Sequence, residues 1–77
     1  MKTIIGVRLE NRKDDAVEFQ DIITEFGCGI KTRIGLHDTF EDKCINSGIV
    51  LLEVVDNSAE ILFEKLSRKW LCKKMEF

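Results

Sequence analysis

The spacing of the apolar residues changes from segment to segment along this chain, and this change limits the possible folds more than any other feature. Residues 3–9 (TIIGVRL) are rich in β-branched residues and show the period of two that is typical of a strand. Residues 10–27 instead place apolar side chains three and four positions apart, as an amphipathic helix does. The same criteria predict strands over about 28–36, 48–55 and 71–77, and a second helix over 56–70.

The predicted order is strand, helix, strand, strand, helix, strand, in a chain of 77 residues that is long enough for one domain, residues 1–77. The handedness of crossovers leaves few arrangements for this order, and it favours an α+β ferredoxin-like βαββαβ sandwich. Both helices then cover one face of a four-stranded antiparallel sheet whose first and third strands are central. The residues expected to form the sheet side of the core are Ile5, Val7, Leu9, Ile34, Leu36, Val50, Leu52 and Val54.

The other face of this sheet is predicted to be apolar in the middle. There the two central strands would present Ile4, Ile49 and Leu51 around Gly6. A contiguous patch of branched aliphatic side chains usually marks a partner surface. A domain of this size also buries only about 60% of its unfolded surface, so self-association is one way to stabilise it. We therefore expect a homo-oligomer, a dimer or a tetramer, with this face, an edge strand or both in the interface.

Lys31 and Arg33 are expected to project from the second strand beside that open face, with His37 at its end. The planar guanidinium of arginine suits carboxylates and phosphates. The three residues are therefore candidates for binding a small anionic ligand at a subunit interface. The alternative is that the two cations only keep an edge strand soluble.

Residues 37–48 (HDTFEDKCINSG) are predicted to form a long polar loop. Imidazole, thiolate and carboxylate groups can bind a divalent metal, which makes His37 and Cys44 candidate ligands. One loop supplies only two good ligands, so a complete site would need a second subunit. The alternative is a solvated loop with a hydrogen-bonded histidine. The sequence indicates no other cofactor, because it contains no CxxC pair.

Several classes of function are disfavoured by the composition. A net charge of −2 gives no reason to expect nucleic-acid binding, and no apolar run reaches the roughly 20 residues of a membrane helix. The three scattered cysteines, Cys28, Cys44 and Cys72, favour a reducing cytoplasm over a disulfide framework. No nucleophile–base pair stands out, so we expect no catalytic residues and no enzyme activity.

Three stretches of the chain, IIGVRLENRKDDAVEFQDIITEFG, IKTRIGLHD and GIVLLEVVDNSAEILFEKLSR, carry a family resemblance. They resemble the small stand-alone ACT-like proteins known as iron-only hydrogenase system regulators, which are related in fold to the C-terminal domain of nickel-responsive regulators. The most distinctive shared stretch is Arg33 to Leu36. The resemblance implies an oligomeric regulatory or ligand-sensing domain without catalysis. The competing expectation is a protein–protein interaction module that binds no small ligand.

Overall fold

The computed structural model describes residues 2–40 and 43–77, with the side chains of residues 39, 40 and 43–45 left aside. It has the predicted order of four strands and two helices. The elements are β1 (Thr3–Leu9), α1 (Arg12–Glu25), β2 (Ile30–Phe40), β3 (Lys43–Val54), α2 (Ala59–Ser67) and β4 (Leu71–Glu76).

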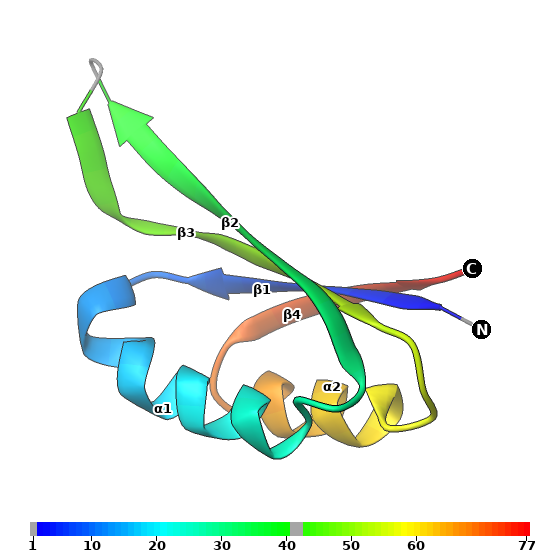
Figure 1. Cartoon of the computed structure of the whole chain (residues 1–77). Coiled ribbons are helices and arrows are strands. Elements are labelled where there is room, and N and C mark those ends of the chain that lie inside the picture. Colours follow the sequence, from blue (N-terminus) through cyan, green and yellow to red (C-terminus); the bar gives the residue numbers. More distant parts are fainter. Residues whose placement is uncertain (1, 41–42) are drawn as a thin grey trace.

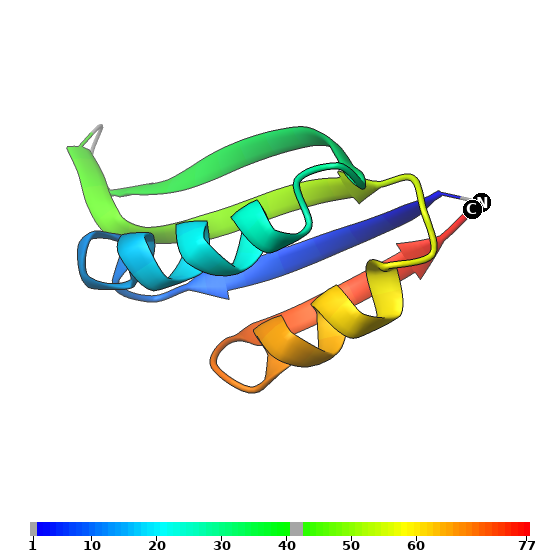
Figure 2. The same cartoon turned by 60° about the horizontal axis from the view of Figure 1, so that its bottom comes forward.

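The four strands form one antiparallel sheet in the order β2-β3-β1-β4, so the first and third strands are central, as predicted. Both helices lie on the same face of this sheet (Figures 1 and 2). The ferredoxin-like fold is therefore confirmed. The face that neither helix covers is called the open face below.

The core lies between the sheet and the helices. Six of the eight predicted sheet residues are buried there, and the alternation along β1 explains why, since Ile5, Val7 and Leu9 all point to the helices. From α1, Phe19 is 1% exposed and meets the Trp70 ring edge to face, with 5.6 Å between ring centroids. The remaining core residues are Ile23, Val50, Leu52, Val54, Ala59, Leu62 and Leu66.

The prediction that Ile34 and Leu36 belong to the core is wrong. They are 49% and 48% exposed and lie on the open face, opposite Leu51 and Ile49 of β3. The cause is a bulge early in β2: Ile30 pairs with Val54 and Thr32 with Glu53, so Lys31 is an extra residue. Because side chains alternate with a period of two, one extra residue moves all later side chains of the strand to the opposite face.

The predicted loop over residues 37–48 is also wrong. β2 runs on to Phe40 and β3 begins at Lys43, so most of this segment is a hairpin. Its distal part, Asp38–Phe40 with Lys43–Ser47, projects past the rest of the sheet and is called the hairpin arm (Figure 1). A second shift in register between His37 and Thr39 accompanies the bend of β3.

The hairpin arm caps the first helix. The side-chain oxygen of Asn46 accepts a hydrogen bond of 3.0 Å from the backbone N–H of Lys13, in the first turn of α1. Asn46 also contacts the side chain of Asn11. Asn11 occupies the N-cap position but makes no capping hydrogen bond with its own side chain. The helix start is therefore attached to a strand that lies more than 30 residues later in the chain.

Gly48 marks the point where β2 and β3 approach most closely. A Cβ atom at this position would overlap the carbonyl oxygen of Leu36 and lie 3.3 Å from the Cα atom of His37. Both neighbours are backbone atoms of the paired strand, so neither can move without disturbing the ladder. The base of the hairpin arm therefore requires glycine here.

We predict that Gly48→Ala lowers the free energy of unfolding by about 1–3 kcal/mol, the usual cost of overpacking. The matched control is Gly27→Ala after α1, away from the open face, where the added methyl would lie 3.4 Å from the carbonyl oxygen of Thr24, an ordinary contact. Urea unfolding of both variants measures the difference. Equal stabilities for the two variants would contradict the close approach at Gly48.

Candidate functional site

The open face is almost continuously apolar, because all four strands contribute aliphatic side chains to it. The predicted interface residues Ile4, Ile49 and Leu51 lie on this face in β1 and β3. The bulge in β2 adds two more, and Leu71 and Met75 of β4 are 66% and 61% exposed beside β1. The apolar members of the open face are Ile4, Ile34, Leu36, Ile49, Leu51, Leu71 and Met75.

A hollow of about 460 Å³ lies on the open face over β1 and β4. Gly6 forms part of its floor, and the absence of a side chain at this central position deepens it. Its walls are mainly aliphatic, from Ile4, Leu51 and Leu71. On the other side of the same face, Ile34 and Leu36 of the edge strand β2 leave about half of their surface exposed, and we call this pair the ridge. The open face thus has both a hollow and an apolar ridge.

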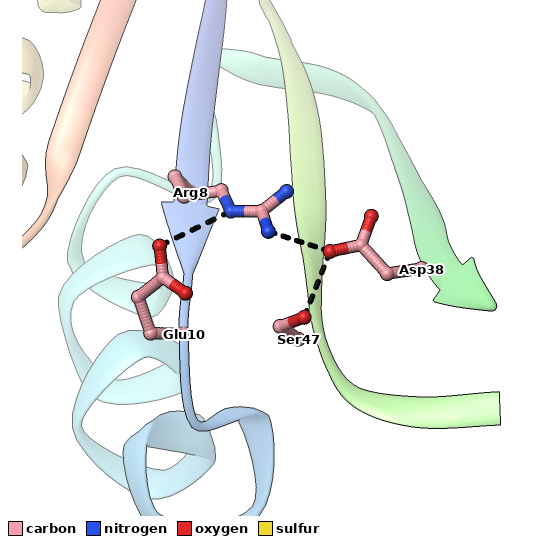
Figure 3. Close-up of polar contacts among 4 residues, drawn as sticks. All are labelled: Arg8, Glu10, Asp38 and Ser47. Carbon is pink, nitrogen blue, oxygen red and sulfur yellow. Dashed lines mark hydrogen bonds and ion pairs between the residues drawn. The ribbon is translucent and has the colours of Figure 1, made fainter. Parts of the chain in front are cut away.

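A polar network borders the hollow at the end nearest the hairpin arm (Figure 3). Arg8 places Nη2 2.6 Å from the Asp38 carboxylate and Nε 3.3 Å from that of Glu10. The Ser47 hydroxyl donates a 2.7 Å hydrogen bond to the same oxygen of Asp38. This hydrogen bond, and then the Arg8 guanidinium, hold the pKa of Asp38 below its ordinary value. The two carboxylates in turn raise the pKa of Arg8.

A second ion pair lies on the open face at the opposite end of the central strands. The Nζ atom of Lys2 is 2.8 Å from the Glu53 carboxylate, which also accepts a 2.7 Å hydrogen bond from Thr32. The Lys2 ammonium and then the Thr32 hydroxyl lower the pKa of Glu53. The two carboxylates of this face, Asp38 and Glu53, are therefore each matched by a cation of the same chain.

The helix side of the sheet has a groove of about 570 Å³ between α1 and the β2–β3 hairpin. Its polar lining is basic, and we call it the basic groove after its four residues Arg12, Lys13, Arg33 and His37. Phe19 and Val50 are among the apolar residues that line its base.

The structure brings two of the three predicted ligand residues together, on the face opposite to the one expected. The bulge turns Arg33 and His37 towards α1, and both line the basic groove. Arg33 donates a 2.5 Å hydrogen bond to the side-chain oxygen of Gln20, and its guanidinium lies 5.5 Å from the centre of the Phe19 ring. Lys31, the bulged residue, is exposed and does not line the groove. Ligand binding by these residues stays a prediction.

The prediction that His37 and Cys44 bind a metal can be compared with the structure only at His37. The side chain of Cys44 lies outside the described ones. His37 lies against Arg12, whose Nη1 atom is 2.7 Å from its Nε2 atom. The same Arg12 atom also contacts Nδ1, so the guanidinium lies against both ring nitrogens and would repel a metal cation that approached either of them. Among the described residues, no three His, Cys, Asp or Glu side chains are grouped closely enough to hold a metal ion.

Arg12, Lys13 and Asn46 are the site residues that sequence reasoning missed. Arg12 lies 25 positions before His37 and Asn46 lies 33 positions after Lys13, so no local pattern connects either pair. The sequence contains one signal for these residues, the stretch Arg12–Lys13 at the predicted helix start. Basic residues there interact unfavourably with the helix dipole.

Comparison with protein-family models, with curated proteins and with solved structures finds no match for this chain. Within the described residues, neither helix has the length and apolar character needed to cross a membrane.

We predict that Asp38→Asn reduces the loss of stability in acid. Since the folded protein holds the pKa of Asp38 below its ordinary value of 3.8, the ionised carboxylate stabilises the fold above that pH. This contribution is lost as the pH falls through the lowered pKa. Urea unfolding at pH 6 and pH 3 should therefore show a smaller difference for Asp38→Asn than for the wild type. Asp21→Asn, which removes the same charge from α1, is the control and should keep the wild-type difference.

Proposed function

We propose that this chain is a regulatory or ligand-sensing domain of the ACT-like kind, which self-associates through its open face and does not itself catalyse a reaction. The observation that carries the proposal is the apolar open face, to which every strand contributes. Exposed apolar patches of this continuity are rare on monomers and are typical of binding surfaces.

A second copy of the same chain is the occupant that fits this face best, because the face carries both complementary shapes. In a two-fold arrangement, the ridge formed by Ile34 and Leu36 of one subunit can enter the hollow over Gly6 of the other, and the reverse contact forms at the same time. Each subunit contributes the same surface, so the contact closes on itself as a dimer. A tetramer needs a further contact, for which the exposed edge strands β2 and β4 are available.

The charges of the open face are compatible with burial. Asp38 and Glu53 already pair with Arg8 and Lys2 within the chain, so an interface need not leave these carboxylates unpaired. Lys73 also projects on this face, opposite Gly6 in the register. Its long apolar stem can lie along the interface while its ammonium group reaches the rim. A stable interface buries roughly 800 Å² of each partner, a modest share of the 5278 Å² of surface on this chain.

The contacts of His37, the single histidine of the sequence, favour a domain that does not catalyse a reaction. His37 is held by a guanidinium and has no carboxylate partner among the described contacts, whereas a general base usually needs an orienting acidic or carbonyl group.

We predict that Ile34→Glu makes the protein monomeric. The substitution places a charge on the ridge that would enter the partner's hollow, and the loss of an anchor of this kind weakens association by roughly 2 kcal/mol or more, about thirtyfold. Light scattering during size-exclusion chromatography at tens of micromolar should give the wild type at least twice the chain mass of 8.9 kDa. Ile34→Glu should give the monomer mass.

The matched control is Ile61→Glu, which makes the same change at an exposed isoleucine of α2. It should leave the mass unchanged, and circular dichroism should show that both variants are folded. A monomeric wild type would overturn self-association. In that case a mixed complex with a different protein, abolished by Ile34→Glu alone, would make the open face part of an interaction module.

A further inference from the structure

We propose that the basic groove binds a small organic anion, recognised through carboxylate or phosphate oxygens by Arg12, Lys13 and Arg33. The groove lies on the helix side of the sheet, so it is separate from the open face. The inference gives the proposed sensing function a ligand class, and in that respect it rests on the proposed function.

The first argument is the distribution of charge. Among the described side chains, Lys2, Arg8, Lys65, Arg68, Lys69 and Lys74 each pair with a carboxylate. Five other cations pair with none of the described carboxylates, although the chain has more acidic than basic residues. Lys31 and Lys73 lie apart from each other outside the groove, whereas Arg12, Lys13 and Arg33 all line it. Cations that gather without a counter-ion destabilise a fold by repulsion, and a bound anion removes this cost.

The second argument is how the two guanidinium groups are held. Arg33 donates to the amide oxygen of Gln20, and Arg12 lies against the ring nitrogens of His37. Both acceptors are formally uncharged groups, so they orient the arginines without neutralising them. Each arginine has five N–H donors, and none of the described groups accepts a hydrogen bond from the remaining ones, which suit a planar carboxylate or a phosphate. This combination of fixed direction and retained charge is what anion recognition requires.

The third argument is the shape of the groove. Its volume of about 570 Å³ lies within the roughly 300–1,000 Å³ that small-molecule sites occupy. Phe19 and Val50 close the base of the groove but are only 1% and 2% exposed, so the exposed Ala16 is the apolar lining residue that the body of a ligand can contact. α1 supplies one wall and the hairpin, through His37 and Asn46, supplies the other. A net charge of −2 disfavours a long polyanion, so a small anion is the better match.

The attachment between α1 and the hairpin arm makes this site responsive. The two walls are joined by the Asn46 hydrogen bond to Lys13 and by the contact of Arg12 with His37. An anion bound to the remaining donors of Arg12 on α1 can also contact Arg33 on β2, because both residues line the same groove. Binding is therefore expected to change the position of the arm relative to the helix, which is one way to transmit a signal.

The experiment is a titration of the full-length chain with two probes, pyrophosphate for phosphate chemistry and citrate for carboxylate chemistry, at constant ionic strength. Amide chemical shifts in two-dimensional NMR spectra report the location and the dissociation constant. Shifts should concentrate at residues 12–20, 33–37 and 46. A response to pyrophosphate alone assigns a phosphate ligand, and a response to citrate alone assigns a carboxylate ligand. Shifts in neither titration, or shifts spread over both helices, would overturn the proposal.

Two variants and one control make the assignment specific. Arg12→Gln and Arg33→Gln should each raise the dissociation constant by about tenfold or more, the usual effect of losing a hydrogen bond to a charged group. Arg68→Gln removes the same charge from the exposed end of α2 and should leave the constant unchanged. An equal weakening in Arg68→Gln would mean that only the general field of the protein attracts the probes, and would refute the site. Arg33→Lys, which keeps the charge without the planar fork, should bind with intermediate strength.

The anion-binding proposal and the self-association proposal can be tested independently of each other. Arg33→Gln should keep the oligomeric mass of the wild type, because Arg33 points away from the open face. Ile34→Glu should keep the anion affinity for the corresponding reason. A monomeric chain that binds the probes would reject self-association and leave the anion site supported. An oligomer that binds neither probe would reject the anion site and leave self-association supported.

Discussion

The extra residue between Ile30 and Thr32 decides which way every later side chain of β2 points. Without this bulge at Lys31, Ile34 and Leu36 would point to the helices, and Arg33 and His37 would lie on the opposite face. With it, the strand gives its aliphatic residues to the open face and its basic residues to α1. Both surfaces to which we assign a function therefore depend on one local irregularity in the pairing of β2 with β3.

The hairpin arm connects these two surfaces. On one side, Asp38 and Ser47 complete the polar network with Arg8 at the border of the open face (Figure 3). On the other side, Asn46 and His37 contact the first turn of α1. The arm is long enough to reach both because the strands extend through a segment whose polar composition resembles a loop. The proposed anion site and the proposed subunit contact are therefore made of different residues, but both border the same structural element.

Sequence reasoning gave the fold correctly, because the fold follows from patterns that are strong and local. Period two over β1, the apolar run of β3 and the helical spacing of Phe19 and Ile23 each indicate one element, and the six elements in this order admit few topologies. The same reasoning placed Ile4, Ile49 and Leu51 on the open face. It failed for β2, because the apolar residues from Ile30 to Leu36 alternate in the sequence whether or not the strand contains a bulge. The periodicity of a sequence therefore does not reveal a shift in the pairing register.

The sequence by itself determined the type and order of the elements, the central position of β1 and β3, and the six buried residues that those strands give to the core. It did so because burial enforces a period that is visible in the chain. The tertiary structure alone decided which face of β2 meets the helices, that residues 37–40 and 43–48 continue the strands, and that Arg12 meets His37. These features depend on pairing register and on contacts between residues 25 or more positions apart, and no local spacing encodes them.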